Sequence, residues 1–92
     1  MEKMIVRSGD ISWKAVEDEI MIIDEHEGTY FCLNAEAAAV WRFLDASRTR
    51  NEILGFMEEN FHIRTKKRRT EIARLVDDML QKRFIVFHEE PE

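Results

Sequence analysis

The sequence has little of what small proteins use for disulfide, metal or membrane attachment. Cys32 is the only cysteine among 92 residues, which excludes an internal disulfide and a cysteine-based metal cage. No apolar run approaches the roughly 20 residues that span a bilayer, and residues 1–10 lack the basic-then-apolar pattern of a signal peptide. We therefore expect no membrane partner and a cytoplasmic location.

Groups that carry catalysis are also sparse. The three glycines are too widely spaced for a phosphate-binding loop. The acidic runs at 17–19 and 24–25 fall in predicted turns, without the apolar pocket that would raise a carboxyl pKa. None of the three histidines has a partner at metal-binding spacing, so we expect them to face solvent: His26, His62 and His88. The sequence predicts a binding protein that is not an enzyme and uses no cofactor or metal.

The length and composition indicate one small domain over residues 1–92. Hydrophobic residues make up 45% of the chain, which is enough for one core, and we expect that core within about 11–88. Residues 89–92, with the only proline, form a predicted acidic tail. The net charge is −5, yet residues 64–74 contain six basic residues and only one acidic residue. The chain is thus an acidic body with one basic patch.

Hydrophobic patterning in the first third of the chain predicts three strands, over residues 11–15, 20–23 and 29–33. Short polar turns separate them, and Gly28 can supply a positive φ in the second turn. Short connections predict an antiparallel meander. In the third strand we expect Cys32 to be a small buried hydrophobe.

Three helices are predicted to follow. Asn34 can cap the first, and Thr49 with Glu52 has the spacing of a capping box for the second. The third, over residues 66–82, has the clearest apolar stripe: Ile72, Leu75, Val76, Met79 and Leu80. Residues 84–88 fit either a short strand or a packed extended tail. The predicted fold is α+β, an N-terminal three-stranded antiparallel β-meander followed by a three-helix winged helix-turn-helix-like bundle.

The third strand is the first candidate binding surface, because a meander places it at the border of the sheet. Native border strands usually carry lysine, proline or a bulge, and this one has neither a charge nor a proline. Its residues are Gly28, Thr29, Tyr30, Phe31, Cys32 and Leu33. Such a border is covered by the chain's own elements, pairs with a second copy, or accepts a peptide strand.

The basic start of the third helix is the second candidate surface. Cations there oppose the helix macrodipole, so they either balance the acidic body as a solvated face or bind an anion or acidic peptide. A basic third helix in this fold also raises the alternative of a DNA-binding or transcription-regulator domain. The acidic body and the pair Asp77-Asp78 argue against nucleic acid as the partner.

Several segments together resemble the PqqD-like family. The similarity covers about residues 13–86 and rests on the order and spacing of its pieces. These pieces are Tyr30-Phe31-Cys32-Leu33-Asn34, Val40-Trp41, Leu44-Asp45, Thr49-Arg50-Asn51-Glu52-Ile53, Leu75-Val76-Asp77-Asp78-Met79-Leu80 and Phe84-Ile85-Val86. The chain departs from the family pattern at Ala46, where a glycine is common after Asp45, and at Lys82-Arg83, where a glycine commonly precedes the exit strand.

The resemblance implies a recognition element for ribosomally synthesised and post-translationally modified peptides (RiPPs). Such a domain binds the leader of a precursor peptide and presents it to a maturation enzyme, often a radical S-adenosylmethionine enzyme. The leader would add to the third strand and lie against the third helix, and Arg68 and Arg69 would meet acidic leader side chains. We expect the helical side of that groove to comprise Arg69, Ala73, Val76, Asp77 and Leu80. The two departures favour a relative that serves a peptide other than the precursor of pyrroloquinoline quinone (PQQ).

Overall fold

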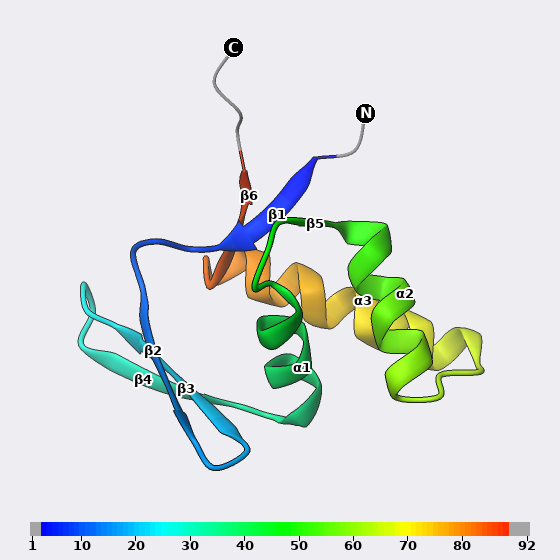
Figure 1. Cartoon of the computed structure of the whole chain (residues 1–92), viewed down its shortest axis with the longest axis horizontal. Coiled ribbons are helices and arrows are strands. Elements are labelled where there is room, and N and C mark those ends of the chain that lie inside the picture. Colours follow the sequence, from blue (N-terminus) through cyan, green and yellow to red (C-terminus); the bar gives the residue numbers. More distant parts are fainter. Residues whose placement is uncertain (1–2, 89–92) are drawn as a thin grey trace.

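The structure is a computed structural model that describes residues 3–88. The predicted acidic tail, residues 89–92, lies outside the described residues. The elements in chain order are β1 (Met4–Arg7), β2 (Ser12–Val16), β3 (Glu19–Asp24), β4 (Thr29–Leu33), α1 (Ala35–Phe43), β5 (Arg48–Thr49), α2 (Arg50–Asn60), α3 (Lys66–Gln81) and β6 (Ile85–His88). Figure 1 shows the larger sheet at one end of the molecule and α2 at the other, with α3 running from beside α2 to the start of β6. The predicted α+β fold is confirmed.

The larger sheet has the strand order β2–β3–β4, with both pairs antiparallel. This confirms the predicted meander and places β4 at its border. A cross-strand row runs through the sheet, because Trp13 and Phe31 both lie opposite Ile22. Gly28 has a φ of 67° in the turn before β4, as the sequence predicts.

The smaller sheet was not predicted. Its order is β5–β1–β6, and β1 pairs antiparallel with both neighbours. The segment Met4–Arg7 alternates too little to be recognised as a strand, and its partners lie more than forty residues away in the chain. Ile5 is 0% exposed, so the core begins before residue 11. The open alternative for residues 84–88 is resolved as a strand, Ile85–His88.

Side-chain caps explain where the helices begin. The Asn34 side chain accepts a hydrogen bond from the backbone N–H of Ala37 at 2.8 Å, as predicted. Thr49 and Glu52 form the predicted capping box, and the bond that the Glu52 carboxylate accepts from the backbone of Thr49 lowers the pKa of Glu52. Thr65 caps α3 by accepting from the N–H of Arg68. These caps satisfy amides that helix starts leave free.

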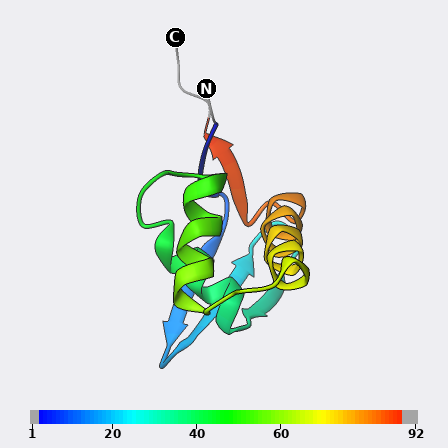
Figure 2. The same ribbon diagram turned by 90° about the vertical axis from the view of Figure 1, so that its right-hand side faces the viewer.

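The core lies between the larger sheet and the helices, with α1 at its centre. Its members are Ile5, Ile20, Ile22, Ala37, Ala38, Val40, Trp41, Leu44, Ile53, Met57, Ile63, Ile72, Val76, Met79, Phe84 and Ile85. Figure 2 shows α2 and α3 side by side with the larger sheet behind them. Among the described residues, no helix has the length and apolar character required to cross a membrane.

Candidate functional site

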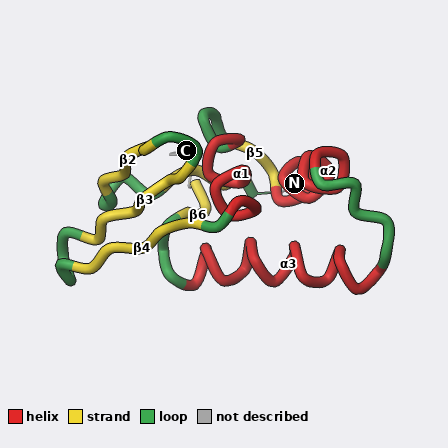
Figure 3. Tube along the Cα trace, turned by 90° about the horizontal axis from the view of Figure 1, so that it is seen from below, coloured by secondary structure: helices red, strands yellow, loops and turns green. Residues whose placement is uncertain are grey.

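The border of β4 is the centre of the candidate site. Within residues 3–88, β4 pairs only with β3, so its other border has no strand partner. Alternate backbone groups of such a border point away from the sheet and can pair with another chain. Figure 3 shows β4 as the outermost strand of its sheet, on the same side of the molecule as α3.

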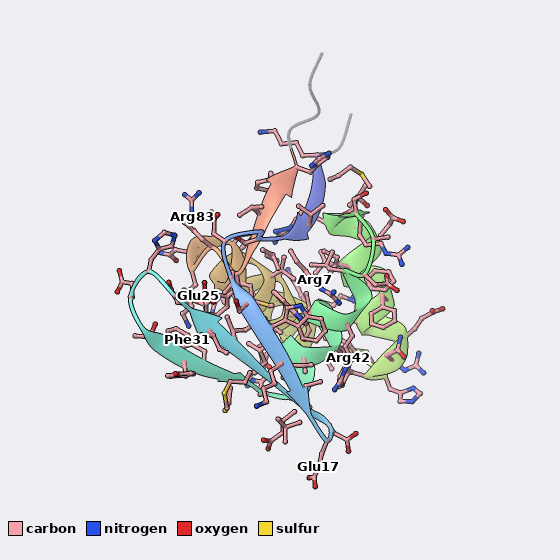
Figure 4. The ribbon with its side chains drawn as sticks, turned by 60° about the vertical axis from the view of Figure 1, so that its left-hand side comes forward. Arg7, Glu17, Glu25, Phe31, Arg42 and Arg83 are labelled. Carbon is pink, nitrogen blue, oxygen red and sulfur yellow. The ribbon has the colours of Figure 1, made fainter. Side chains whose placement is uncertain are left out.

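The inner face of β4 presents a partly uncovered aromatic ring. Phe31 is 37% exposed, whereas Ile22, its partner on β3, is 0% exposed. The ring of Phe31 contacts the ring of Phe84 with 5.1 Å between centroids. The rest of the Phe31 ring is therefore free to contact another apolar side chain beside the border, where Figure 4 labels it.

The outer face of β4 carries the most exposed aromatic side chain described. Tyr30 is 68% exposed, and Cys32 is also exposed. The expectation that Cys32 is buried is wrong, because residue 32 alternates with the inward Phe31 and Leu33 and so lies on the face away from the core. Thr29, at the start of β4, is exposed as well.

Phe84 is placed beside Phe31 by the way α3 ends. The N–H of Phe84 donates to the carbonyl of Met79, and the N–H of Arg83 donates to the carbonyl of Leu80. This pair of bonds is a Schellman motif, whose turning residue is usually glycine. Here Arg83 takes that position with a φ of 63°, so the turn keeps the left-handed conformation without a glycine. Phe84 was not among the predicted site residues.

Arg68 joins α3 to the helix that follows β4. Its guanidinium pairs with the carboxylates of Glu36, in the first turn of α1, and of Glu71. The hydrogen bonds to Glu71 and then to Glu36 raise the pKa of Arg68. The Arg68 flank of α3 therefore lies beside the first turn of α1, the helix that follows β4, and half-buried Leu75, seven residues on, lies on the same flank.

The other predicted residues of α3 contact α2, the core or β6. Arg69 pairs with Glu58 of α2. Asp77 pairs with Arg50 at 2.6 Å, and the Ala73 carbonyl accepts a bond from the same guanidinium. Val76 is 0% exposed, and Leu80 is half-buried beside the strand β6. Helical spacing places these residues on one side of α3, but it does not say which neighbouring element that side contacts.

The remaining cations of α3 are more available to an acidic ligand. Lys66, Lys67 and Arg74 line a shallow surface pocket together with Thr70 and Glu71. Among the residues 3–88 none of these three cations forms a salt bridge. Acidic ligands would therefore find free positive charge here rather than at Arg68 or Arg69.

Histidine, cysteine and carboxylate side chains do not form a cluster in the described part of the chain. His26, His62 and His88 are all exposed, as predicted. No group of three or more histidine, cysteine or carboxylate side chains within residues 3–88 could hold a metal ion. The geometry at β4 is that of a surface for a chain in extended conformation.

Comparisons with known proteins identify a family and a similar fold. Residues 19–85 match the family model described as coenzyme PQQ synthesis protein D (PqqD). A solved structure described as "TbiB1 in Complex with the TbiA(beta) Leader Peptide" superimposes with a TM-score of 0.70 at 18% identity, covering 95% of this chain and 99% of the other. A search of curated proteins finds no match.

Proposed function

The chain belongs to the PqqD family, and on that premise we propose that it is a non-catalytic peptide chaperone. It binds the leader of a ribosomally synthesised precursor peptide by adding the leader as a strand to β4. The observation that carries this proposal is the open border of β4 with its half-uncovered Phe31. The structural neighbour with a leader peptide bound supports it.

Strand addition would work here through two kinds of contact. Backbone hydrogen bonds along Thr29–Leu33 provide affinity for any extended peptide, and side-chain contacts select among peptides. A leader side chain that faces inward would cover Phe31 and reach Phe84, the ring that Phe31 already touches. Selection would therefore favour a leader with a large apolar residue at that position.

The helical wall of the site is proposed to be the Arg68 flank of α3. Arg68 itself is held by Glu36 and Glu71, so its role is to fix α3 beside the end of β4. Lys67 and Arg74 would meet acidic leader side chains. Arg69, Ala73, Val76, Asp77 and Leu80 would support the wall from behind, through their contacts with α2, the core and β6.

The second partner would be the enzyme that modifies the core of the precursor peptide. The family resemblance makes a radical S-adenosylmethionine enzyme the leading candidate, in a RiPP pathway or a PQQ-type pathway. In this proposal the chemistry belongs to that partner. A cytoplasmic location stays a prediction from the sequence.

The test uses a fluorescent synthetic peptide with the leader sequence of the precursor gene nearest to the gene of this chain. Cys32→Pro removes one backbone donor from β4, whereas Cys32→Ala removes the thiol and keeps the donor. We expect Cys32→Ala to bind as the wild type does. Cys32→Pro should bind at least about tenfold more weakly, a change of roughly 1.4 kcal/mol.

A far-ultraviolet circular dichroism spectrum must show that Cys32→Pro is folded. If a folded Cys32→Pro binds the leader as tightly as Cys32→Ala does, a peptide contact through that amide is excluded. Random duplex DNA serves as the second ligand. We expect no binding to it tighter than about 1 μM at physiological salt, because the chain as a whole has a net charge of −5.

A further inference from the structure

We propose that in the absence of a leader β4 pairs with β4 of a second copy of this chain, antiparallel and about a twofold axis. A free strand border is self-complementary, because antiparallel pairing lets each copy offer the same donors and acceptors to the other. The larger sheets of the two copies would then join into one six-stranded sheet. This inference goes beyond the proposed function, and its test needs no leader.

The distribution of charge selects β4 for this contact. The chain has a net charge of −5, so two copies repel one another unless they meet where like charges are absent. In the larger sheet β2 carries Lys14, and β3 carries Glu19 and Asp24. β4 is the strand of that sheet without a charged side chain.

The side chains of β4 also suit self-pairing. In a register centred on Phe31, Tyr30 of each copy lies opposite Cys32 of the second copy. On β3 the outward neighbours of this pair are Ile23 and Met21, both half-buried. Pairing would extend this apolar outer face across the new border and cover Tyr30, which is 68% exposed in one copy.

Self-pairing has a consequence for the proposed function. The border is five residues long, so the dimer should be weak. A leader that adds to β4 needs the same backbone groups, and therefore leader and second copy exclude one another. Free protein would protect its own border until a leader displaces the copy.

The experiment is sedimentation equilibrium of the full chain over a range of concentrations. We expect a reversible monomer–dimer equilibrium in the wild type. The variant Tyr30→Lys/Cys32→Lys places lysine opposite lysine across the border, and these side chains are exposed in one copy. Its dimer dissociation constant should rise at least about tenfold, because like charges directly opposite destabilise a strand pair.

The matched control is Val16→Lys on β2. Val16 is 48% exposed on the same outer face, and with Lys14 it creates two lysines at the same spacing on the other border strand. This variant should dimerise as the wild type does. A wild type that stays monomeric up to its solubility limit would overturn the proposal, as would a dimer that survives Tyr30→Lys/Cys32→Lys.

Cross-linking gives an independent readout on the unmodified sequence. Because Cys32 is the only cysteine, a short bismaleimide can join two copies only through β4. On diagonal positions of paired strands the two Cys32 side chains would lie roughly 7–8 Å apart. We expect cross-linked dimers in the wild type and in Val16→Lys. Absence of cross-linked dimers at concentrations where sedimentation finds dimers would place the interface elsewhere and overturn the proposal.

Discussion

The two border strands of the larger sheet, β2 and β4, differ in the side chains that pack against them. On β2 the inward Trp13 packs edge-on against Trp41, and the guanidinium of Arg7 lies 4.9 Å from the centre of the Trp13 ring. On β4 the corresponding ring, Phe31, has Phe84 on one side and solvent on the other. In Figure 4, Arg7 lies near the β2 border of the sheet and Phe31 near the β4 border.

The two border strands also differ in their charged side chains and in how the turn after β2 is held. β2 carries Lys14, a common guard of border strands, and the turn that follows is tied to α1 because Arg42 donates to the Asp18 carbonyl. β4 has no such guard. Within residues 3–88 neither β2 nor β4 has a second strand partner, so the two borders differ in their charge and in their ties to the rest of the chain.

The largest expected effect is a loss of stability when Arg7, which packs against β2, is truncated. Arg7 donates a hydrogen bond to the carbonyl of Trp41 at 2.9 Å and stacks near both tryptophan rings. Burial lowers the pKa of Arg7, an effect partly offset by Asp45. Arg7→Ala should reduce the free energy of unfolding by about 2–3 kcal/mol.

Urea denaturation measures this change, with Arg42→Ala as the control. Arg42 is exposed and has one hydrogen bond to Asp18 and a long one to Arg7 through its own carbonyl. Its truncation should cost less than about 1 kcal/mol. Equal losses for Arg7→Ala and Arg42→Ala would show that Arg7 does not support the β2 border in the way described.

The next effect concerns the β4 side and leader affinity. Phe31→Ala should weaken leader binding by about tenfold, roughly 1.4 kcal/mol, because the apolar contact of the leader is lost. The control is Phe87→Ala, since Phe87 is a similarly exposed aromatic residue, at 45%, on β6. Titration of both variants with the labelled leader would contradict the account if they lost the same affinity.

The smallest effects concern the two turns of the meander. Glu17, in the turn between β2 and β3, has a φ of 58°, and Gly28, in the turn before β4, has a φ of 67°; Figure 4 shows Glu17 at the tip of its turn. Glu17→Gly should stabilise the fold by about 0.5 kcal/mol, and Gly28→Ala should destabilise it by about 1 kcal/mol.

Thermal melting of the two variants checks these signs. A Cβ added at Gly28 would have no heavy atom within 4 Å, so only the backbone conformation should matter there. If Gly28→Ala left the melting temperature unchanged, the left-handed conformation of that turn would not be required.

Interactions between residues close in the sequence made much of this fold predictable. The cap at Asn34, the capping box at Thr49 and the three strands of the meander depend on residues close in the chain. The smaller sheet could not be predicted in that way, because β1 meets its partners β5 and β6 only in the folded chain.

The site was predictable in part for the same reason. The border position of β4 follows from the order of the meander, and it was predicted. Which side of α3 contacts α1 and which contacts α2 depends on tertiary ion pairs, Arg68 with Glu36 and Arg69 with Glu58, and these pairs have no signature in sequence spacing. Phe84 was missed because its place beside Phe31 depends on the turn at Arg83.

Amide hydrogen exchange of β4 with and without the leader tests the central claim most directly. At low protein concentration the outward amides of Thr29–Leu33 should exchange rapidly in the free chain and become protected when the leader is saturating. The amides of β2, Ser12–Val16, provide the comparison within the same molecule and should not change. A saturating leader that protects no amide of β4, or protects β2 equally, would contradict strand addition at this border.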